Sequence, residues 1–135
     1  CGNLGEVKSN YNIEDDSDGV YVGGISGVIT VSNSKDVFDS VKISKCYNYG
    51  IINGQKYIGG ITGRVSTNSN IEYCFNNGKI IGDDKVGGIT GTLPNNNTKI
   101  CSCYNFGEIS GNSWGSMRNC RILCRKFIFY WKNRL

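Results

Sequence analysis

Short apolar stretches separated by glycine and asparagine recur along residues 1–114. Each recurrence opens with a cysteine, with glycine four residues later and an aliphatic residue six residues later. The cysteines that open the recurrences are Cys1, Cys46, Cys74 and Cys103, and the last three lie 28 and 29 residues apart. A fixed period in this range is typical of proteins built by stacking repeats. The pattern therefore predicts a repeat array.

Within each repeat, apolar and polar residues alternate in three stretches: around Ile52, around Ile58 and Ile61, and from Ile71 to Cys74. Turn-forming Gly, Asn and Asp residues separate these stretches, so each predicts a short strand. No helical period of useful length occurs before residue 115. We therefore expect an all-β fold, a parallel β-helix of about four coils with about 28 residues per coil, in which inward aliphatic side chains stack.

The repeats divide residues 1–114 into the segments 1–45, 46–73, 74–102 and a truncated 103–114. The first repeat is longer by 17 residues: nine precede Val22, and eight lie between Gly27 and Ile43. Insertions that leave the flanking pattern intact are expected in loops. We expect the loops at residues 10–18 and 28–40.

Paired glycines and a single asparagine recur at fixed positions of the repeat. Paired glycines such as Gly59-Gly60 are expected at a bend, with either positive φ or close backbone approach. The Asn two residues after each cysteine is expected to hydrogen-bond its copy in the next coil. These residues are Asn3, Asn48, Asn76 and Asn105.

The cysteines should be buried small apolar residues rather than functional thiols, and whether they form disulfides stays open.

Residues 115–135 form a basic, aromatic tail in which the repeat is lost. The formal net charge is +4, but the last 18 residues carry six Lys or Arg and no acid, so residues 1–117 sum to −2. The tail fits a cap on the stack, a segment that binds acidic surfaces, or an out-of-frame read-through, and its abrupt start favours the last. The acidic repeat body gives no support for nucleic-acid binding. The longest apolar run, 127–131, is too short to span a membrane.

The blocks Gly24-Ile25-Ser26-Gly27, Gly60-Ile61-Thr62-Gly63 and Gly88-Ile89-Thr90-Gly91 stand within Cys-Tyr-Asn-x-Gly-x-Ile-x-Gly units. They resemble the GLUG repeat of bacterial cell-surface proteins, with Ile in place of Leu. The resemblance covers about residues 1–114, and the lost fourth repeat and the long first repeat depart from it. It implies a right-handed parallel β-helix in a secreted or wall-attached, hence extracellular, bacterial protein. Some members of the family are immunoglobulin-A-specific zinc metallopeptidases, and others look like adhesins.

Candidate catalytic chemistry is sparse. The peptidases of this family use a His-Glu-x-x-His helix, and the chain has no histidine. Asp83-Asp84 is the only acidic pair in the regular repeats, and solvated turn acids are its simplest interpretation rather than a glycan-cleaving pair. We therefore expect no enzyme activity, no catalytic residue and no cofactor.

Metal sites are also not expected. Glu14, Asp16 and Asp18 are spaced like the front of a calcium loop, but Ile25 stands at the twelfth position and cannot ligate, which leaves a solvated loop or a looser Ca²⁺ site. Cysteines 101, 103, 120 and 124 lack the spacing of zinc knuckles. Cys1-Gly2 resembles a mature lipoprotein start, but the next residues keep the repeat pattern, so we do not expect lipidation.

Aromatic side chains beside the repeated Asn are the best candidates for contact with a partner. They are Tyr47, Tyr49, Phe75, Tyr104 and Phe106. They would suit a host or cell-surface glycan or protein, or would only cover the Asn corner. We expect a non-catalytic stalk or adhesin-like scaffold flanked by further repeats of a longer chain. The alternative is an accessory segment of a secreted metallopeptidase or glycan-active enzyme.

Overall fold

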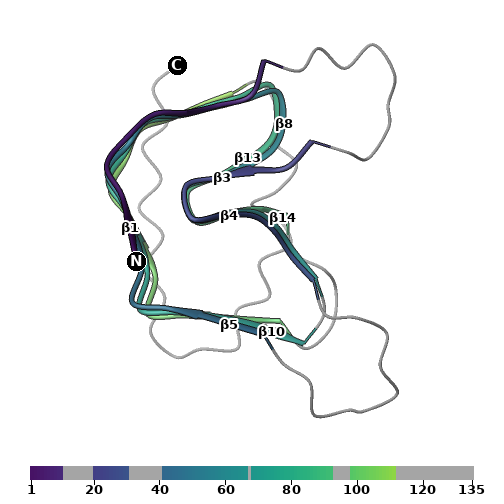
Figure 1. Ribbon diagram of the computed structural model, residues 1–135, viewed down its shortest axis with the longest axis vertical. Helices are drawn as coiled ribbons and strands as arrows, with labels where there is room; N and C mark the ends of the chain where they lie inside the picture. The colour runs from purple at the N-terminus through teal and green to yellow at the C-terminus, as the bar shows by residue number, and fades with distance from the viewer. Residues whose placement is uncertain (11–19, 31–40, 67, 93–97, 112–135) are drawn as a thin grey trace.

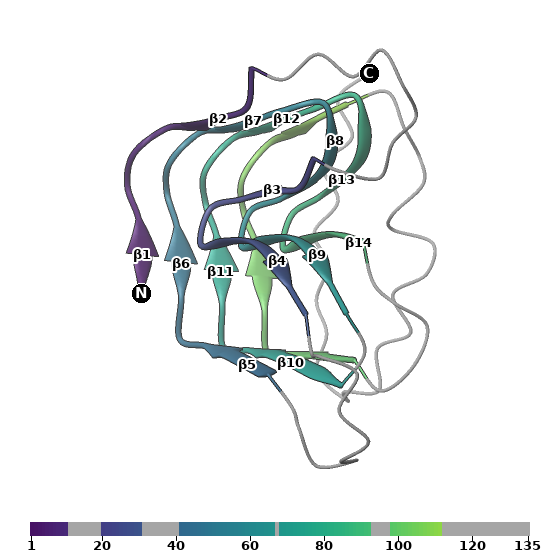
Figure 2. The ribbon, with the colours of Figure 1, turned by 45° about the vertical axis from the view of Figure 1, so that its right-hand side comes forward.

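The computed structural model describes residues 1–10, 20–30, 41–66, 68–92 and 98–111. This part of the chain is all-β, with strands β1 to β17 in five parallel sheets and no helix. Each sheet is formed by equivalent strands of successive repeats, so the repeats superimpose in Figure 1 and lie side by side in Figure 2. The expectation of stacked parallel strands is therefore confirmed.

Two of the sheets have four strands. The first contains β1 (Gly2–Asn3), β6 (Tyr47–Asn48), β11 (Phe75–Asn76) and β16 (Tyr104–Asn105). The second contains β2 (Val7–Lys8), β7 (Ile52–Asn53), β12 (Ile80–Ile81) and β17 (Ile109–Ser110).

Three sheets have three strands. One contains β3 (Val22–Gly23), β8 (Lys56–Gly59) and β13 (Asp84–Gly87). The next contains β4 (Ser26–Ile29), β9 (Thr62–Val65) and β14 (Thr90–Thr92). The last contains β5 (Val41–Ser44), β10 (Ser69–Glu72) and β15 (Lys99–Cys101).

The repeat at 46–73 holds five strands, β6 to β10, so the expectation of three strands per repeat was wrong. Tyr47–Asn48 forms a strand that is too short to show alternation in the sequence. The stretch around Ile58 and Ile61 is two strands, because the chain bends between Gly59 and Thr62. These short strands are defined by hydrogen bonds to the neighbouring repeats, which a pattern within one repeat does not reveal.

The long first repeat keeps its register with the second. Gly2 pairs with Tyr47, Val22 with Ile58, and Ile43 with Ile71. The two insertions therefore fall between strands, but Val28 and Ile29, which were expected in the second loop, belong to β4. Residues 11–19 and 31–40, which include most of the expected loops, and residues 112–135, with the tail and Cys120 and Cys124, lie outside the described residues.

The bend at Gly-Gly-Ile divides the apolar interior into two clusters. Strands β3 and β13 run inward, and β4 and β14 run back outward (Figure 1). Ile58, before the bend, belongs to one cluster, and Ile61, after it, belongs to the other. The first cluster contains Val22, Ile52, Ile58, Ile80 and Val86. The second contains Ile29, Cys46, Ile61, Val65, Ile71, Cys74, Ile89, Ile100 and Cys103.

Glycine is needed at the bend because backbone and side chains approach closely there. A Cβ on Gly60 would lie 2.3 Å from the carbonyl oxygen of Gly88 and 2.5 Å from Cγ of Asn76. A Cβ on Gly63 would lie 2.5 Å from the carbonyl oxygen of Tyr57. The tip of the bend thus packs against the Asn76 side chain of β11, and the two strands beside the bend pack against each other.

Of the two roles expected for the paired glycines, close approach is the one observed. No glycine in the described ranges has a positive φ. The left-handed conformation occurs instead at other residue types, mostly at equivalent positions of successive repeats: Lys45, Tyr73 and Ser102 before the cysteines, Tyr57 and Lys85 before the bend, and Asn68. The left-handed corners of the described chain are therefore formed by residues other than glycine.

Candidate binding face

The repeated asparagines hold the sheet β1-β6-β11-β16 from inside. Asn48 is fully buried, and its Nδ2 donates to the carbonyl oxygen of Gly50 at 2.9 Å and to Oδ1 of Asn76 at 2.6 Å. Its Oδ1 accepts from Nδ2 of Asn3 at 2.8 Å and from the Gly50 amide at 3.2 Å. Both donors and both lone pairs of this amide are therefore used.

The ladder continues from Asn76 to Asn105, with Nδ2 of Asn76 donating to Oδ1 of Asn105 at 2.7 Å. The predicted amide ladder is thus confirmed across all four repeats. Because successive residues of a strand face opposite ways, the inward Asn fixes its neighbours on the outer surface.

Five aromatic residues lie on this outer surface, and we call them the aromatic face. The rings of Tyr47 and Phe75 stack at 5.7 Å with an interplanar angle of 17°, and Tyr49 packs edge-on against Phe75 at 5.6 Å. Tyr104 and Phe106 stack at 6.2 Å. Tyr49, Tyr104 and Phe106 are 50%, 38% and 65% exposed. Of the two interpretations left open by the sequence, solvent-facing rings are the one observed for these three.

Among the described residues, the outward positions of this sheet hold no ionised side chain. The positions one residue after each cysteine are Gly2, Tyr47, Phe75 and Tyr104, and those three residues after are Leu4, Tyr49, Asn77 and Phe106. Leu4 is 74% exposed and extends the apolar surface. The nearest charges along these chain segments include Lys79 and Glu108, which pair with each other at 3.7 Å. Such a surface suits a neutral, flat partner better than a charged one.

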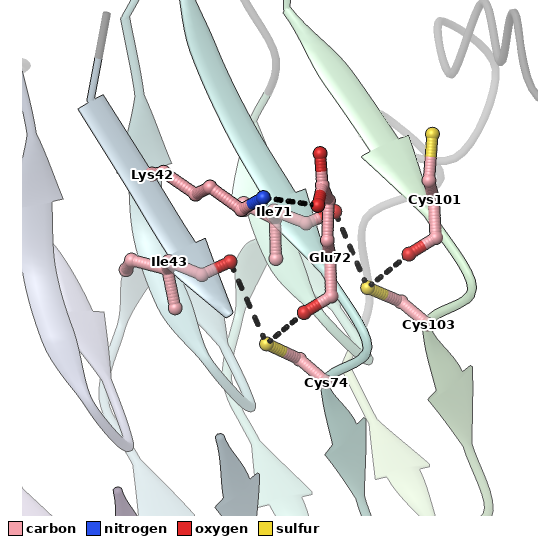
Figure 3. A network of polar contacts seen from close by, with 7 residues as sticks. All are labelled: Lys42, Ile43, Ile71, Glu72, Cys74, Cys101 and Cys103. Atoms are coloured by element: carbon pink, nitrogen blue, oxygen red, sulfur yellow. Dashed lines mark hydrogen bonds and ion pairs between the residues drawn. The ribbon is translucent and has the colours of Figure 1, made fainter. Parts of the chain in front are cut away.

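The cysteine column lies at the corner between sheets. Cys46, Cys74 and Cys103 are buried and form no disulfide within the described residues, while Cys1 is exposed. Figure 3 shows the Sγ atoms of Cys74 and Cys103 pointing toward backbone carbonyls: Cys74 donates to Glu72 at 3.2 Å, and Cys103 to the carbonyl of Cys101 at 3.3 Å. The expectation that the repeated cysteines are buried holds for three of the four.

A hydrogen bond to the Cys74 sulfur, together with burial, raises the pKa of the Cys103 thiol, which therefore stays protonated at neutral pH. Within the described ranges, no group of three or more Cys, Asp or Glu residues is placed to hold a metal ion. Positions 120, 124, 14, 16 and 18, where the sequence was considered for zinc or calcium sites that are not expected, lie outside those ranges.

Asp83 and Asp84 lie at the start of β13, where the sequence predicts a turn. Asp83 is exposed and Asp84 is half-buried, and both backbone amides donate to the carbonyl oxygen of Gln55, at 3.0 and 2.9 Å. Backbone hydrogen bonds to Gln55 thus hold the pair at the start of β13.

A cluster of tyrosines and cations near the bend was not predicted from the sequence. Tyr21, Tyr57 and Lys85 occupy one position in three successive repeats, each directly before the paired residues Val22, Ile58 and Val86. Arg64 contacts the hydroxyl of Tyr21, and Lys85 that of Tyr57. The only signal in the sequence was the constant distance from the Gly-Gly block, and the change of residue type hid it.

Comparisons with protein-family models, with curated proteins and with solved structures find no match. In the ranges that the structure describes, no helix is long and apolar enough to cross a membrane.

Proposed function

We propose that residues 1–114 form a parallel β-helix of about four coils, with one repeat per coil, in a GLUG-like module of a bacterial surface or secreted protein. The five sheets of equivalent strands support this arrangement, as does the pairing of each repeat with the next. In such a stack every coil depends on its neighbours, so further repeats of a longer chain would extend it at either end.

We further propose that this module is a non-catalytic scaffold that binds a cell-surface or host glycan, or a neutral protein surface, through its aromatic face. The observation that carries the proposal is the outward set of Tyr and Phe rings, which the Asn ladder holds in a fixed arrangement. Aromatic rings present rigid apolar surface, and their ordering before a partner arrives reduces the entropy lost on binding.

Binding would be multivalent along the stack. Rings stand on three consecutive strands, β6, β11 and β16, so one extended partner would contact several of them at once. Linking weak contacts in this way raises the overall affinity far above that of one ring. An accessory segment of a secreted metallopeptidase or glycan-active enzyme would use the same face to hold a substrate, with its catalytic groups elsewhere.

An array of glycans and matrix proteins tests the proposal. The double variant Tyr49→Ser/Phe106→Ser removes two of the most exposed rings of the aromatic face, and Tyr73→Ser removes a ring that is 61% exposed outside it. We expect the unaltered protein and Tyr73→Ser to bind the same array members, and the double variant to bind them at least about tenfold more weakly.

Far-UV circular dichroism of all three proteins provides the control for folding. A correctly folded unaltered protein that binds no member of the array would contradict the proposed function. Equal binding by the double variant would assign the contact to another surface. A spectrum dominated by helix would contradict the parallel β-helix itself.

A further inference from the structure

Three cations gather around two tyrosines beside the bend, and we call Tyr21, Lys56, Tyr57, Arg64 and Lys85 the cation–tyrosine cluster. The rings of Tyr21 and Tyr57 lie 5.0 Å apart. Nζ of Lys85 donates to the Tyr57 hydroxyl at 2.6 Å and lies 4.2 Å from the centre of that ring. Nζ of Lys56 lies 5.3 Å from the same ring centre.

Arg64 completes the cluster from the neighbouring sheet. Its Nη1 donates to the Tyr21 hydroxyl, and its Cζ lies 5.3 Å from the centre of the Tyr21 ring. The tyrosine hydroxyls thus accept hydrogen bonds from two cations and hold both in defined positions. Arg64 is exposed and Lys85 is half-buried, so the cluster reaches the protein surface.

Carboxylates do not neutralise Arg64 or Lys85 within the described part of the chain. The ion pairs found there join Lys42 to Glu72 and Lys79 to Glu108. Asp84, the strand partner of Lys56, forms no ion pair with Lys85 in the same part of the chain. Arg64 and Lys85 are held at two adjacent tyrosine rings, where their positive charges repel each other, and a bound anion would relieve this repulsion.

We propose that the cation–tyrosine cluster binds an oxyanion, the sulfate or carboxylate group of an acidic glycan. Guanidinium and ammonium groups form strong charge-assisted hydrogen bonds with such groups, and here they are already fixed by the tyrosines. The glycan as the source of the oxyanion rests on the proposed function, because that proposal places the module at a cell surface. The site itself is separate, since β8 and β13 lie across the cross-section from β1 (Figure 1).

The experiment is isothermal titration calorimetry of the full chain with a sulfated heparin tetrasaccharide, its desulfated counterpart and inorganic sulfate. All proteins carry glutamine at the six basic tail positions 118, 121, 125, 126, 132 and 134, because cations there would bind any polyanion. The test variant is Lys85→Gln/Arg64→Gln. The control, Lys8→Gln/Lys99→Gln, has the same net charge and alters two exposed lysines outside the cluster.

We expect the sulfated tetrasaccharide to bind the parent and the control equally, and the test variant at least about tenfold more weakly. The desulfated sugar should not bind. A second parent, with Glu14→Gln and Asp15, Asp16 and Asp18 changed to Asn, removes competition from the chain's own carboxylates.

Absence of binding by both parents would overturn the proposal, and so would equal weakening in the test variant and the control. Inorganic sulfate that binds as tightly as the tetrasaccharide would overturn the glycan assignment. Failure here is distinguishable from failure of the proposed function, because Tyr49→Ser/Phe106→Ser alters only the aromatic face and should leave this titration unchanged.

Discussion

The two faces of the sheet β1-β6-β11-β16 follow different rules. Its inner face holds Asn3, Asn48, Asn76 and Asn105, one residue type in every repeat, whereas the outer face holds Gly2, Tyr47, Phe75 and Tyr104. Each inner amide bonds to the next copy of itself, so no other side chain fits that position without loss of hydrogen bonds. The outer positions carry no such requirement, and this leaves them available for contact with partners.

The largest loss of stability is expected from a side chain added at Gly60, which packs against the Asn ladder. Gly60→Ala places a Cβ 2.3 Å from a backbone oxygen and 2.5 Å from the Asn76 side chain. Because the backbone at Gly88 and the Asn76 side chain would have to move, we expect the free energy of unfolding to fall by about 4 kcal/mol. Urea denaturation measures this value.

Gly5→Ala is the matched control for the glycine substitution. A Cβ there would meet its nearest neighbour, Oδ1 of Asn3, at 3.9 Å. We expect a change within about 0.5 kcal/mol of the unaltered protein. If both glycine variants lose stability equally, the bend does not pack against the ladder as described.

The same contrast of inside and outside recurs in two cysteines that are close in the sequence, Cys101 and Cys103. Cys103 is buried among isoleucines, while Cys101 lies on β15 and is half-buried. Cys103→Leu overfills the interior, so we expect a loss of about 2 kcal/mol, and we expect less than about 1 kcal/mol for Cys101→Leu. Thermal unfolding of both variants measures the difference, and a larger loss in Cys101→Leu would reverse the assignment of the two sides.

A smaller effect is expected at the corner before Cys46. Lys45 has a φ of 55°, a conformation that disfavours residues with a Cβ. Lys45→Gly should therefore raise the free energy of unfolding by about 0.5 kcal/mol, after the greater freedom of glycine in the unfolded chain is subtracted. Lys99→Gly, in strand β15, should lower it by a similar amount, and a loss in both variants would contradict the assigned corner.

The sequence reveals those parts of the molecule that use one residue type in every repeat. The Asn ladder and the buried cysteines could be predicted because equivalent residues of stacked strands meet directly. The insertions of the first repeat could be placed because register is kept on either side of them.

Other features depend on contacts between different residue types, and the sequence conceals them. The paired glycines indicated the bend, but the two separate strands beside it were not predicted, because Ile58 and Ile61 look like one alternating strand although they lie in separate apolar clusters. The corners were missed because Lys45 and Tyr73, rather than glycine, adopt the left-handed conformation. The cation–tyrosine cluster was missed because its cations come from different positions of the repeats.

The most direct test of the account compares two neighbouring residues, Asn48 and Tyr49, by equilibrium urea unfolding. Asn48→Ala leaves the amide and carbonyl of Gly50 and the facing atoms of Asn3 and Asn76 without their partner. We predict a loss of about 3 kcal/mol for Asn48→Ala and of less than about 1 kcal/mol for Tyr49→Ala, whose ring is half-exposed. Equal losses, or a greater loss for Tyr49→Ala, would contradict the claim that the inner face maintains the fold and the outer face is free to bind.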